Sequence, residues 1–271
     1  MSNLVRAELL KIRTTSAGWW LALGAFLSLA VAFAFNVWMA TLVFGGRGEM
    51  FGSTGEQGSA AVQAANIYTS GQYFGLMFVM LIGILMVTNE FFHQTASTTF
   101  LATPRRTKVI GSKLVAASIL GLLFWLVTTV IDLVGGSIFL TVADQGSQLG
   151  TWTVQRALLL NLLAYATWTV LGVGIGTLIT NQLGAVITAT ALYLVGTQVV
   201  GLLFLLLANL LDSQAIIKWQ VLWPAVASQV MVAGEATEFT PDWWAGALVL
   251  VGYAIVTGTV GVMLTRKRDI S

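Results

Sequence analysis

The sequence predicts an all-α integral membrane protein, and three observations carry that prediction. Of the 271 residues, 57% are hydrophobic and only 9% are charged, whereas about 25% of the residues of soluble domains are charged. The mean hydropathy is +0.85. Six apolar stretches are long enough to cross a bilayer, and at about 20 residues each only helices can do so, because lipid satisfies no backbone polar group. We therefore expect one transmembrane domain over residues 1–271.

The six stretches define the predicted transmembrane helices. They cover residues 18–42, 73–88, 114–142, 154–180, 185–208 and 243–264. The third is the longest, and its excess length fits either a tilted helix or a helical extension beyond the membrane.

The distribution of Lys and Arg predicts the orientation, since positive charge is retained on the cytoplasmic side. With a cytoplasmic N-terminus, three basic residues lie outside and ten lie inside. The outer three are Arg47, Arg156 and Lys218, and the inner ten are Arg6, Lys11, Arg13, Arg105, Arg106, Lys108, Lys113, Arg266, Lys267 and Arg268. We expect a multi-pass plasma-membrane protein with both termini in the cytoplasm. Because the basic clusters adjoin apolar runs, they indicate topology and no nucleic-acid partner.

The residues before the first span predict a short helix in the cytoplasmic interface. Val5, Leu9 and Ile12 share one side of such a helix, while Arg6 and Arg13 lie towards the other, although Glu8 interrupts the apolar arc. The alternative is an unstructured basic leader that only sets the topology. The apolar run that follows exceeds the length of a signal-peptide core, so we expect it to remain as the first span.

The two long outer connections differ in composition. Residues 44–72 are rich in Gly, Ser and Gln and predict a flexible loop. Residues 209–242 contain a partly apolar hairpin that Pro224 interrupts. It is either a helix that enters or lies on the outer interface, with Trp219 and Trp223 at headgroup level, or a loop packed on its own protein.

The sequence lacks the residues that catalysis requires. It has no phosphate-binding loop, no HExxH pattern and no GxSxG pattern. The absence of cysteine excludes disulfides and thiolate metal ligands. Glu90 and His93 form a single Glu-x-x-His step, whereas di-iron bundles need two steps and two further glutamates. We expect no catalytic residue, no metal site and no cofactor in this chain.

Polar residues within the spans are the candidates for a translocation path. They are Asn36, Asp132 and Gln198. Asp132 lies about 28 Å along the third helix from Lys113, so it either lines a water-filled outer vestibule or hydrogen-bonds a neighbouring helix. Interhelical hydrogen bonds account for Asn36, Asn161 and Gln198 without a functional role. Gly172, Gly174 and Gly176 predict close helix packing.

The polar segment 89–113 between the second and third spans is longer than topology requires. It contains the single histidine and four of the thirteen Lys and Arg residues. From Glu90 to Pro104 it has the length of about three to four helical turns, with no glycine and with Pro104 as a stop signal. We expect a firm helical protrusion in the cytoplasm that is suited to docking a partner.

This segment resembles the permease subunits of ABC transporters of the type-two exporter class. The resemblance consists of an acid that ends the second span, an aromatic residue, a short polar helix with a threonine, a Leu-Ala-Thr-Pro turn, arginines and a lysine that opens the third span. The matching residues are Glu90, Phe91, His93, Thr95, Thr99, Leu101, Ala102, Thr103, Pro104, Arg105, Arg106 and Lys113. The family commonly has glycine before the threonine, where this chain has Gln94.

The resemblance implies a function. Two permeases, identical or related, would form the pore, and each would dock a separate ATP-binding subunit, which holds ATP and Mg, through the interfacial helix and the coupling helix from Glu90 to Pro104. Arg105 and Arg106 would contact membrane lipids or the ATPase. The cargo would be hydrophobic or amphipathic: a drug, a lipid or a peptide. The alternatives are an ion-coupled secondary carrier, which would want internal repeats and midplane charges, and a scaffold that transports nothing.

Overall fold

The computed structural model of the protein describes residues 2–47, 58–95, 99, 106–233 and 240–267. These residues form helices and no β-sheet. In chain order the elements are α1 (Ser2–Thr14), α2 (Ser16–Leu42), the π-helical η1 (Val43–Arg47), α3 (Ala60–Tyr68), α4 (Gln72–Phe92), α6 (Arg106–Val142), α7 (Trp152–Leu178), α8 (Gln182–Ala191), the π-helical η4 (Leu192–Gly196), α9 (Thr197–Leu210), the 3-10 helix η5 (Gln214–Leu222), α10 (Pro224–Val232) and α11 (Trp243–Lys267).

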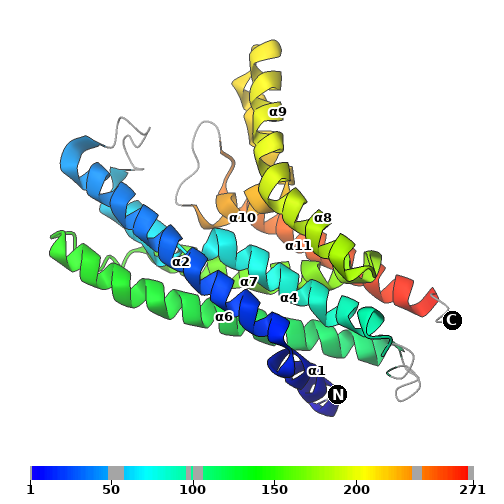
Figure 1. The fold of residues 1–271 in the computed structure, drawn as a ribbon. Helices are drawn as coiled ribbons and strands as arrows, with labels where there is room; N and C mark the ends of the chain where they lie inside the picture. The colour runs from blue at the N-terminus through cyan, green and yellow to red at the C-terminus, as the bar shows by residue number, and fades with distance from the viewer. Residues whose placement is uncertain (1, 48–57, 96–98, 100–105, 234–239, 268–271) are drawn as a thin grey trace.

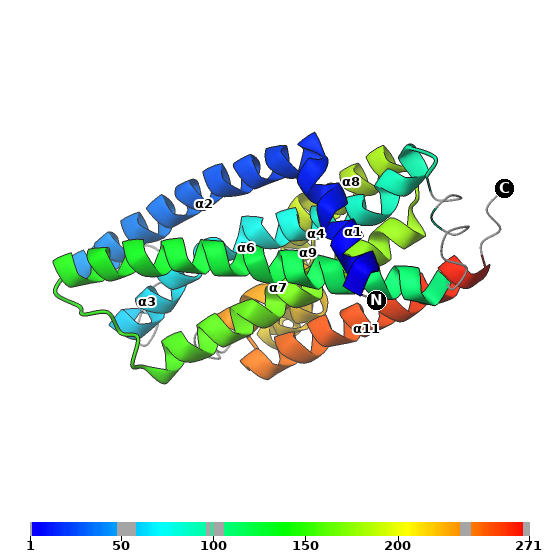
Figure 2. The same ribbon diagram turned by 90° about the horizontal axis from the view of Figure 1, so that it is seen from below.

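Six helical runs are long and apolar enough to cross a membrane within the described part of the chain, which confirms an all-helical fold with six candidate spans. They are Gly18–Arg47, Ala60–Phe92, Thr107–Val142, Trp152–Leu178, Gln182–Leu210 and Trp243–Leu264. The long helices run side by side, while α1 crosses the bundle at the end where α11 finishes (Figures 1 and 2). The run formed by α8, η4 and α9 leans away from the bundle at its far end (Figure 1).

Helix α4 is the centre of the bundle, and α7 packs closely along it. Most residues of α4 between Gly75 and Glu90 are buried within the chain. Glycines on both helices allow the contact, since a Cβ at Gly172 would lie 2.1 Å from the Met80 carbonyl oxygen and one at Gly83 would lie 2.5 Å from that of Thr169. This confirms the prediction that glycines of the fourth span serve packing, as small residues do where helices associate in lipid.

Helix α3 corrects the prediction of a flexible loop over residues 44–72. Its first turn is capped by Ser59, whose side chain accepts a hydrogen bond from the Val62 amide at 3.3 Å. Ile67 and Tyr68 are fully buried, so apolar burial outweighs the polar composition of the segment around them. The part of the predicted loop at 48–57 lies outside the described residues.

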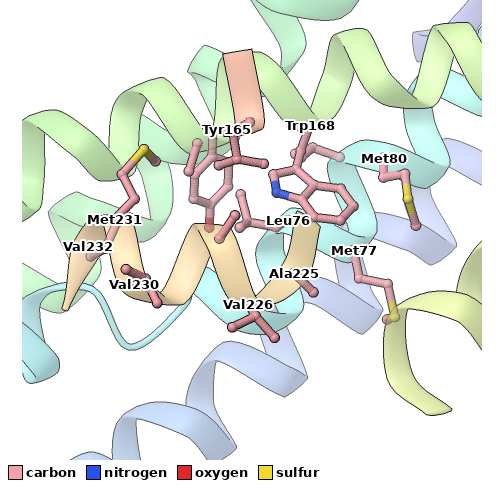
Figure 3. Close-up of a cluster of buried hydrophobic side chains, with 14 of the residues drawn as sticks. Leu76, Met77, Met80, Tyr165, Trp168, Ala225, Val226, Val230, Met231 and Val232 are labelled. Atoms are coloured by element: carbon pink, nitrogen blue, oxygen red, sulfur yellow. The ribbon is translucent and has the colours of Figure 1, made fainter. Parts of the chain in front are cut away.

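The hairpin before α11 packs on its own protein. Helices η5 and α10 meet at Trp223 with a bend of 104°, and Pro224 occupies the first turn of α10, where the missing amide hydrogen costs nothing. Seven residues of α10 are buried, and Figure 3 shows Ala225, Val226 and Val230 beside side chains of α4 and α7. The hairpin is therefore helical and α10 packs on its own protein, while the bent pair of η5 and α10 also has the length and composition of a broken span or a re-entrant segment.

The glycine contact between α4 and α7 yields a stability prediction. The substitution Gly172→Ala should destabilise the fold by about 1–3 kcal/mol, since the new methyl group has only backbone to displace. Gly252→Ala in α11 is the matched control, because a Cβ there meets nothing within 4 Å. Thermal unfolding in detergent should show a lower Tm for the first variant and an equal or higher Tm for the second. Equal Tm changes in the two would contradict the close contact.

Candidate functional site

Four charged side chains from three helices meet at the end of the bundle where α1 lies. Lys11 of α1 binds Glu8 Oε1 at 2.9 Å and Glu90 Oε1, in the last turn of α4, at 2.6 Å. Lys113 of α6 binds Glu8 Oε2 at 2.8 Å and Glu90 Oε1 at 2.9 Å. Each lysine therefore bridges both carboxylates, and we call these four residues the ion cluster.

The ion cluster is largely removed from solvent. Lys113 is 1% exposed, and Glu8 and Glu90 are each 5% exposed. Burying an ion costs several kcal/mol unless its partners and hydrogen bonds compensate. Here the two positive and two negative charges balance, and Lys113 Nζ also donates to the Met86 carbonyl at 2.9 Å. The arrangement fixes α1 against both α4 and α6.

Lys11 is the most exposed member of the ion cluster, and its pKa reflects its partners. Partial burial alone would lower the pKa of Lys11, but hydrogen bonds and charge from Glu90 and Glu8 outweigh that effect and raise the pKa above its ordinary value of 10.5. A lysine whose pKa is higher in the folded state stabilises that state fully at pH values below the pKa of the same lysine in the unfolded chain. This contribution is therefore complete at neutral pH and is lost only as the pH rises through the raised pKa.

Sequence reasoning assigned no role to Glu8 or Lys11. Glu8 interrupts the apolar side formed by Val5, Leu9 and Ile12, and this interruption was the available signal. The three apolar residues pack against buried side chains of α4 and α6, so the carboxylate that shares their side is buried with them and reaches Lys113. Helix α1 is thus a helix docked on the bundle and not an unstructured leader. Of its other predicted residues, Arg6 and Arg13 are exposed.

Helix α4 ends directly after the ion cluster. The amide of Thr95 donates to the Glu90 carbonyl at 2.8 Å, and the amide of Gln94 donates to that of Phe91 at 3.2 Å. This pair of hydrogen bonds is the Schellman motif, whose penultimate residue is left-handed, and Gln94 has φ +55. At this position, where the family that the segment resembles commonly has glycine, the backbone is left-handed, a conformation that glycine adopts most readily.

This helix end corrects one prediction for the segment 89–113. A single helix from Glu90 to Pro104 is wrong at its start, because Glu90 belongs to α4 and the chain leaves the helix at Gln94. The approach to the third span is also helical from Arg106. Leu101, Ala102, Thr103, Pro104 and Arg105 lie outside the described residues, as does the side chain of Arg106.

The described residues just beyond α4 remain close to the ion cluster. Thr99 Oγ1 lies 3.5 Å from Glu90 Oε1 and donates to the Thr95 carbonyl at 3.0 Å. Phe91 packs against the same apolar side chains as α1. His93 is exposed, and its ring lies edge-on to that of Phe92 with centroids 5.0 Å apart. The structure thus brings Glu90, Phe91 and Thr99 to the α1 end of the bundle.

Asp132 lies at the other end of α4. Its Oδ2 accepts a hydrogen bond from the Gly71 amide at 3.2 Å, where α3 stops and α4 begins. Tyr165 donates to the Gly71 carbonyl at 3.2 Å. Asp132 is 1% exposed, so its geometry is that of an acid bonded to a neighbouring helix, at a helix N-terminus that favours negative charge. A place on a translocation path stays a prediction for this residue.

Asn36 and Tyr73 line one polar cavity of about 250 Å³, together with Asn66, Gln72 and Gln229. The Gln198 side chain of α9 interacts with the Tyr73 hydroxyl of α4, in line with the predicted interhelical contact.

Two other amides depart from the predicted interhelical hydrogen bonds. Asn36 Nδ2 donates to the Ala32 carbonyl of its own helix at 3.0 Å. The buried Oδ1 of Asn161 has no hydrogen-bond partner in the described structure, so the predicted interhelical bond is wrong for that oxygen.

The described residues offer no group of three His, Cys, Asp or Glu side chains that could hold a metal ion. The ion cluster has only two carboxylates, and both are bound by lysines. The arrangement can transmit force between helices, because it joins three of them at one point.

The fold and the ion cluster define a polytopic helical membrane protein with a charged junction where the second and third spans meet the N-terminal helix. A protein-family model described as ABC-2 family transporter protein matches residues 4–197, which is more than half of the chain. The chain therefore belongs to the ABC-2 transporter family and is a membrane permease subunit of an ABC transporter. No curated protein sequence matches it. The predicted family is confirmed.

The ion cluster yields a prediction for stability. Glu8→Gln and Lys113→Met should each destabilise the fold by about 3 kcal/mol, because each leaves a buried charge with one partner fewer. The double variant should lose less than the sum of the two, since the partners are removed together. Denaturant unfolding in detergent measures all three. Arg13→Gln, at an exposed position of the same helix, should change stability by at most about 0.5 kcal/mol. Strict additivity would contradict direct pairing of Glu8 with Lys113.

Proposed function

We propose that this permease subunit couples ATP hydrolysis in separate ATP-binding subunits to movement of its helices through the ion cluster. The observation that carries the proposal is the joining of α1, α4 and α6 by Glu8, Lys11, Glu90 and Lys113. A partner that displaces α1 or the segment after Glu90 would move all three helices together. ATP and Mg would be bound by the partner, and this chain would carry out no covalent chemistry.

The charge distribution supports a cytoplasmic position for the ion cluster. Ten of the thirteen Lys and Arg residues belong to the predicted cytoplasmic segments, and α1 and the end of α11 lie at the same end of the bundle (Figures 1 and 2). ATP-binding subunits would meet the protein there. Phe92, which is 68% exposed beside the ion cluster, offers an apolar contact for such a partner.

A second permease, identical or related, would complete the pore. The outer helices support this proposal, since few residues of the spans that contain α2, α9 and α11 are buried in the single chain. Part of that surface would face lipid and part the second subunit. The cargo would be hydrophobic or amphipathic and would move outward. An ion-coupled carrier is less well supported, because Asp132 is the single acid within the predicted spans, whereas proton relays of carriers use chains of ionisable residues.

Removing one charge from the ion cluster tests the coupling. In a complex with its ATP-binding subunits, Glu90→Gln should assemble and reach the membrane but lose most of the cargo-stimulated ATPase activity, because neither lysine would then be held to α4 by a carboxylate. Purified complexes in proteoliposomes, assayed with and without candidate cargo, give the measurement.

The matched control is Asp144→Asn, an exposed acid at the opposite end of α6. It should leave stimulation unchanged. Full stimulation in the Glu90→Gln complex would falsify the coupling role.

The orientation has its own test. A protease-cleavable tag placed after Lys267 should be cut only when protease is added to inverted membrane vesicles, since we place the C-terminal end in the cytoplasm. The same tag inserted after Ser147, in the turn between α6 and α7, should be cut only when protease is added to the outside of spheroplasts, whose plasma membrane is intact. The reverse pattern would overturn the orientation, and with it the cytoplasmic position of the ion cluster that the coupling proposal requires.

A further inference from the structure

A second cavity, about 290 Å³ in volume, lies inside the single chain and has no role in the coupling described above. Its walls come from α4, α7, α8, η4, α10 and α11, and include Trp168, Leu171, Tyr193, Trp223 and Tyr253. Figure 3 shows part of this region, with Trp168 of α7 near Met80 of α4 and Ala225 of α10. The cavity belongs to one subunit and does not need a second copy to form.

Three of the aromatic walls present carbon to the cavity, because their polar atoms are bound elsewhere. Trp168 Nε1 donates to Ser228 Oγ at 2.6 Å, and the Tyr193 hydroxyl donates to the Tyr73 carbonyl at 2.6 Å. Trp223 Nε1 donates to Thr197 Oγ1 at 3.2 Å. These bonds also fix the orientation of each ring. The rings of Trp168 and Tyr193 stand edge to face with centroids 5.0 Å apart.

The π-helical turn η4 shapes one wall. A π-turn inserts an extra residue into a helix, which changes the direction of the side chains that follow. At its end is Gly196, where a Cβ would lie 2.8 Å from Trp223 Cζ2. The absence of a side chain at this position lets the indole of Trp223 lie directly against the helix, where it lines the cavity.

The surroundings of the opening are apolar. Leu192 at its edge is 52% exposed, and Val195 on the same run and Val256 on α11 are 61% and 58% exposed. Both runs belong to the candidate spans, so the opening faces the hydrocarbon of the bilayer. A buried water needs two to four polar partners, which these walls do not supply, and a charged headgroup would lose its hydration there.

We propose that this cavity binds a single alkyl chain of a bilayer lipid. Such a chain is already in an apolar medium, so the gain comes from dispersion contacts with rigid ring faces that disordered neighbouring chains do not offer. The volume is at the lower end of ligand pockets, which measure about 300–1,000 Å³, and suits one chain better than a drug-sized molecule. A chain in this position braces α8 and η4 against α11.

Photolabelling in proteoliposomes tests the proposal without the ATP-binding subunits, so its failure would leave the coupling proposal untouched. The vesicles contain phosphatidylethanolamine, phosphatidylglycerol and a phosphatidylcholine with a diazirine in its acyl chain. Peptides that contain Leu171 and Tyr253 should be labelled. Ala189→Phe, which fills the cavity from a buried position, should reduce that label about tenfold, the change that about 1.4 kcal/mol produces.

Two further variants make the result decisive. Leu192→Trp blocks the opening from a half-exposed position that tolerates size, so it should reduce the label even if Ala189→Phe fails to fold. Val256→Trp adds the same bulk to the neighbouring lipid-facing surface and should leave the label unchanged. The label on the exposed face of α6 is the internal reference. Equal labelling of Leu171 and Tyr253 in all four proteins, or an equal loss in the Val256→Trp control, would overturn the alkyl-chain site.

Discussion

A buried lysine is the constraint on which the rest of the structure depends. Lys113 would be too costly to bury alone, so α6 can pack at this depth only where α1 supplies Glu8 and α4 supplies Glu90. That requirement sets the position of α1 and the last turn of α4. The Schellman motif then ends α4 at Gln94, about one turn after Glu90. The proposed coupling uses an arrangement that burial already demands.

Away from the ion cluster, close van der Waals packing of the helices contributes more to the bundle than ion pairs do. In lipid the hydrophobic effect does not drive helices together, so close packing must do so. The glycines of α4 and α7 bring two backbones into contact, and the hydrogen bonds of Trp168, Tyr193 and Trp223 hold rigid rings around the space that remains. The apolar cavity is therefore a consequence of fixed aromatic geometry beside a bent hairpin, where no flexible side chain fills the gap.

The sequence predicted the features that depend on local composition. Apolar length predicted the six helical runs, and the small residues around Gly172 predicted close packing. Helix α3 was missed because the polar composition of its loop outweighed nine residues with a serine cap. The pairing of Glu8 with Lys113 joins residues 105 positions apart, and no local pattern indicates a partner at that distance. Asp132 likewise accepts a hydrogen bond from the Gly71 amide, which is free because the helix breaks between α3 and α4. The sequence did not predict that break.

The break at Gly71 divides the second apolar run into two helices of unequal length, α3 and α4. A movement of α4 that begins at Glu90 would stop at this break, because α3 is a separate helix joined to α4 by a turn. Buried Tyr68 fixes α3 by donating a hydrogen bond to the Ser147 carbonyl at 2.6 Å. The movement would instead be transmitted to α7, because α4 is in backbone contact with that helix. If the proposed coupling moves α4, α7 would therefore move with it, while α3 stays held at its own end by Tyr68.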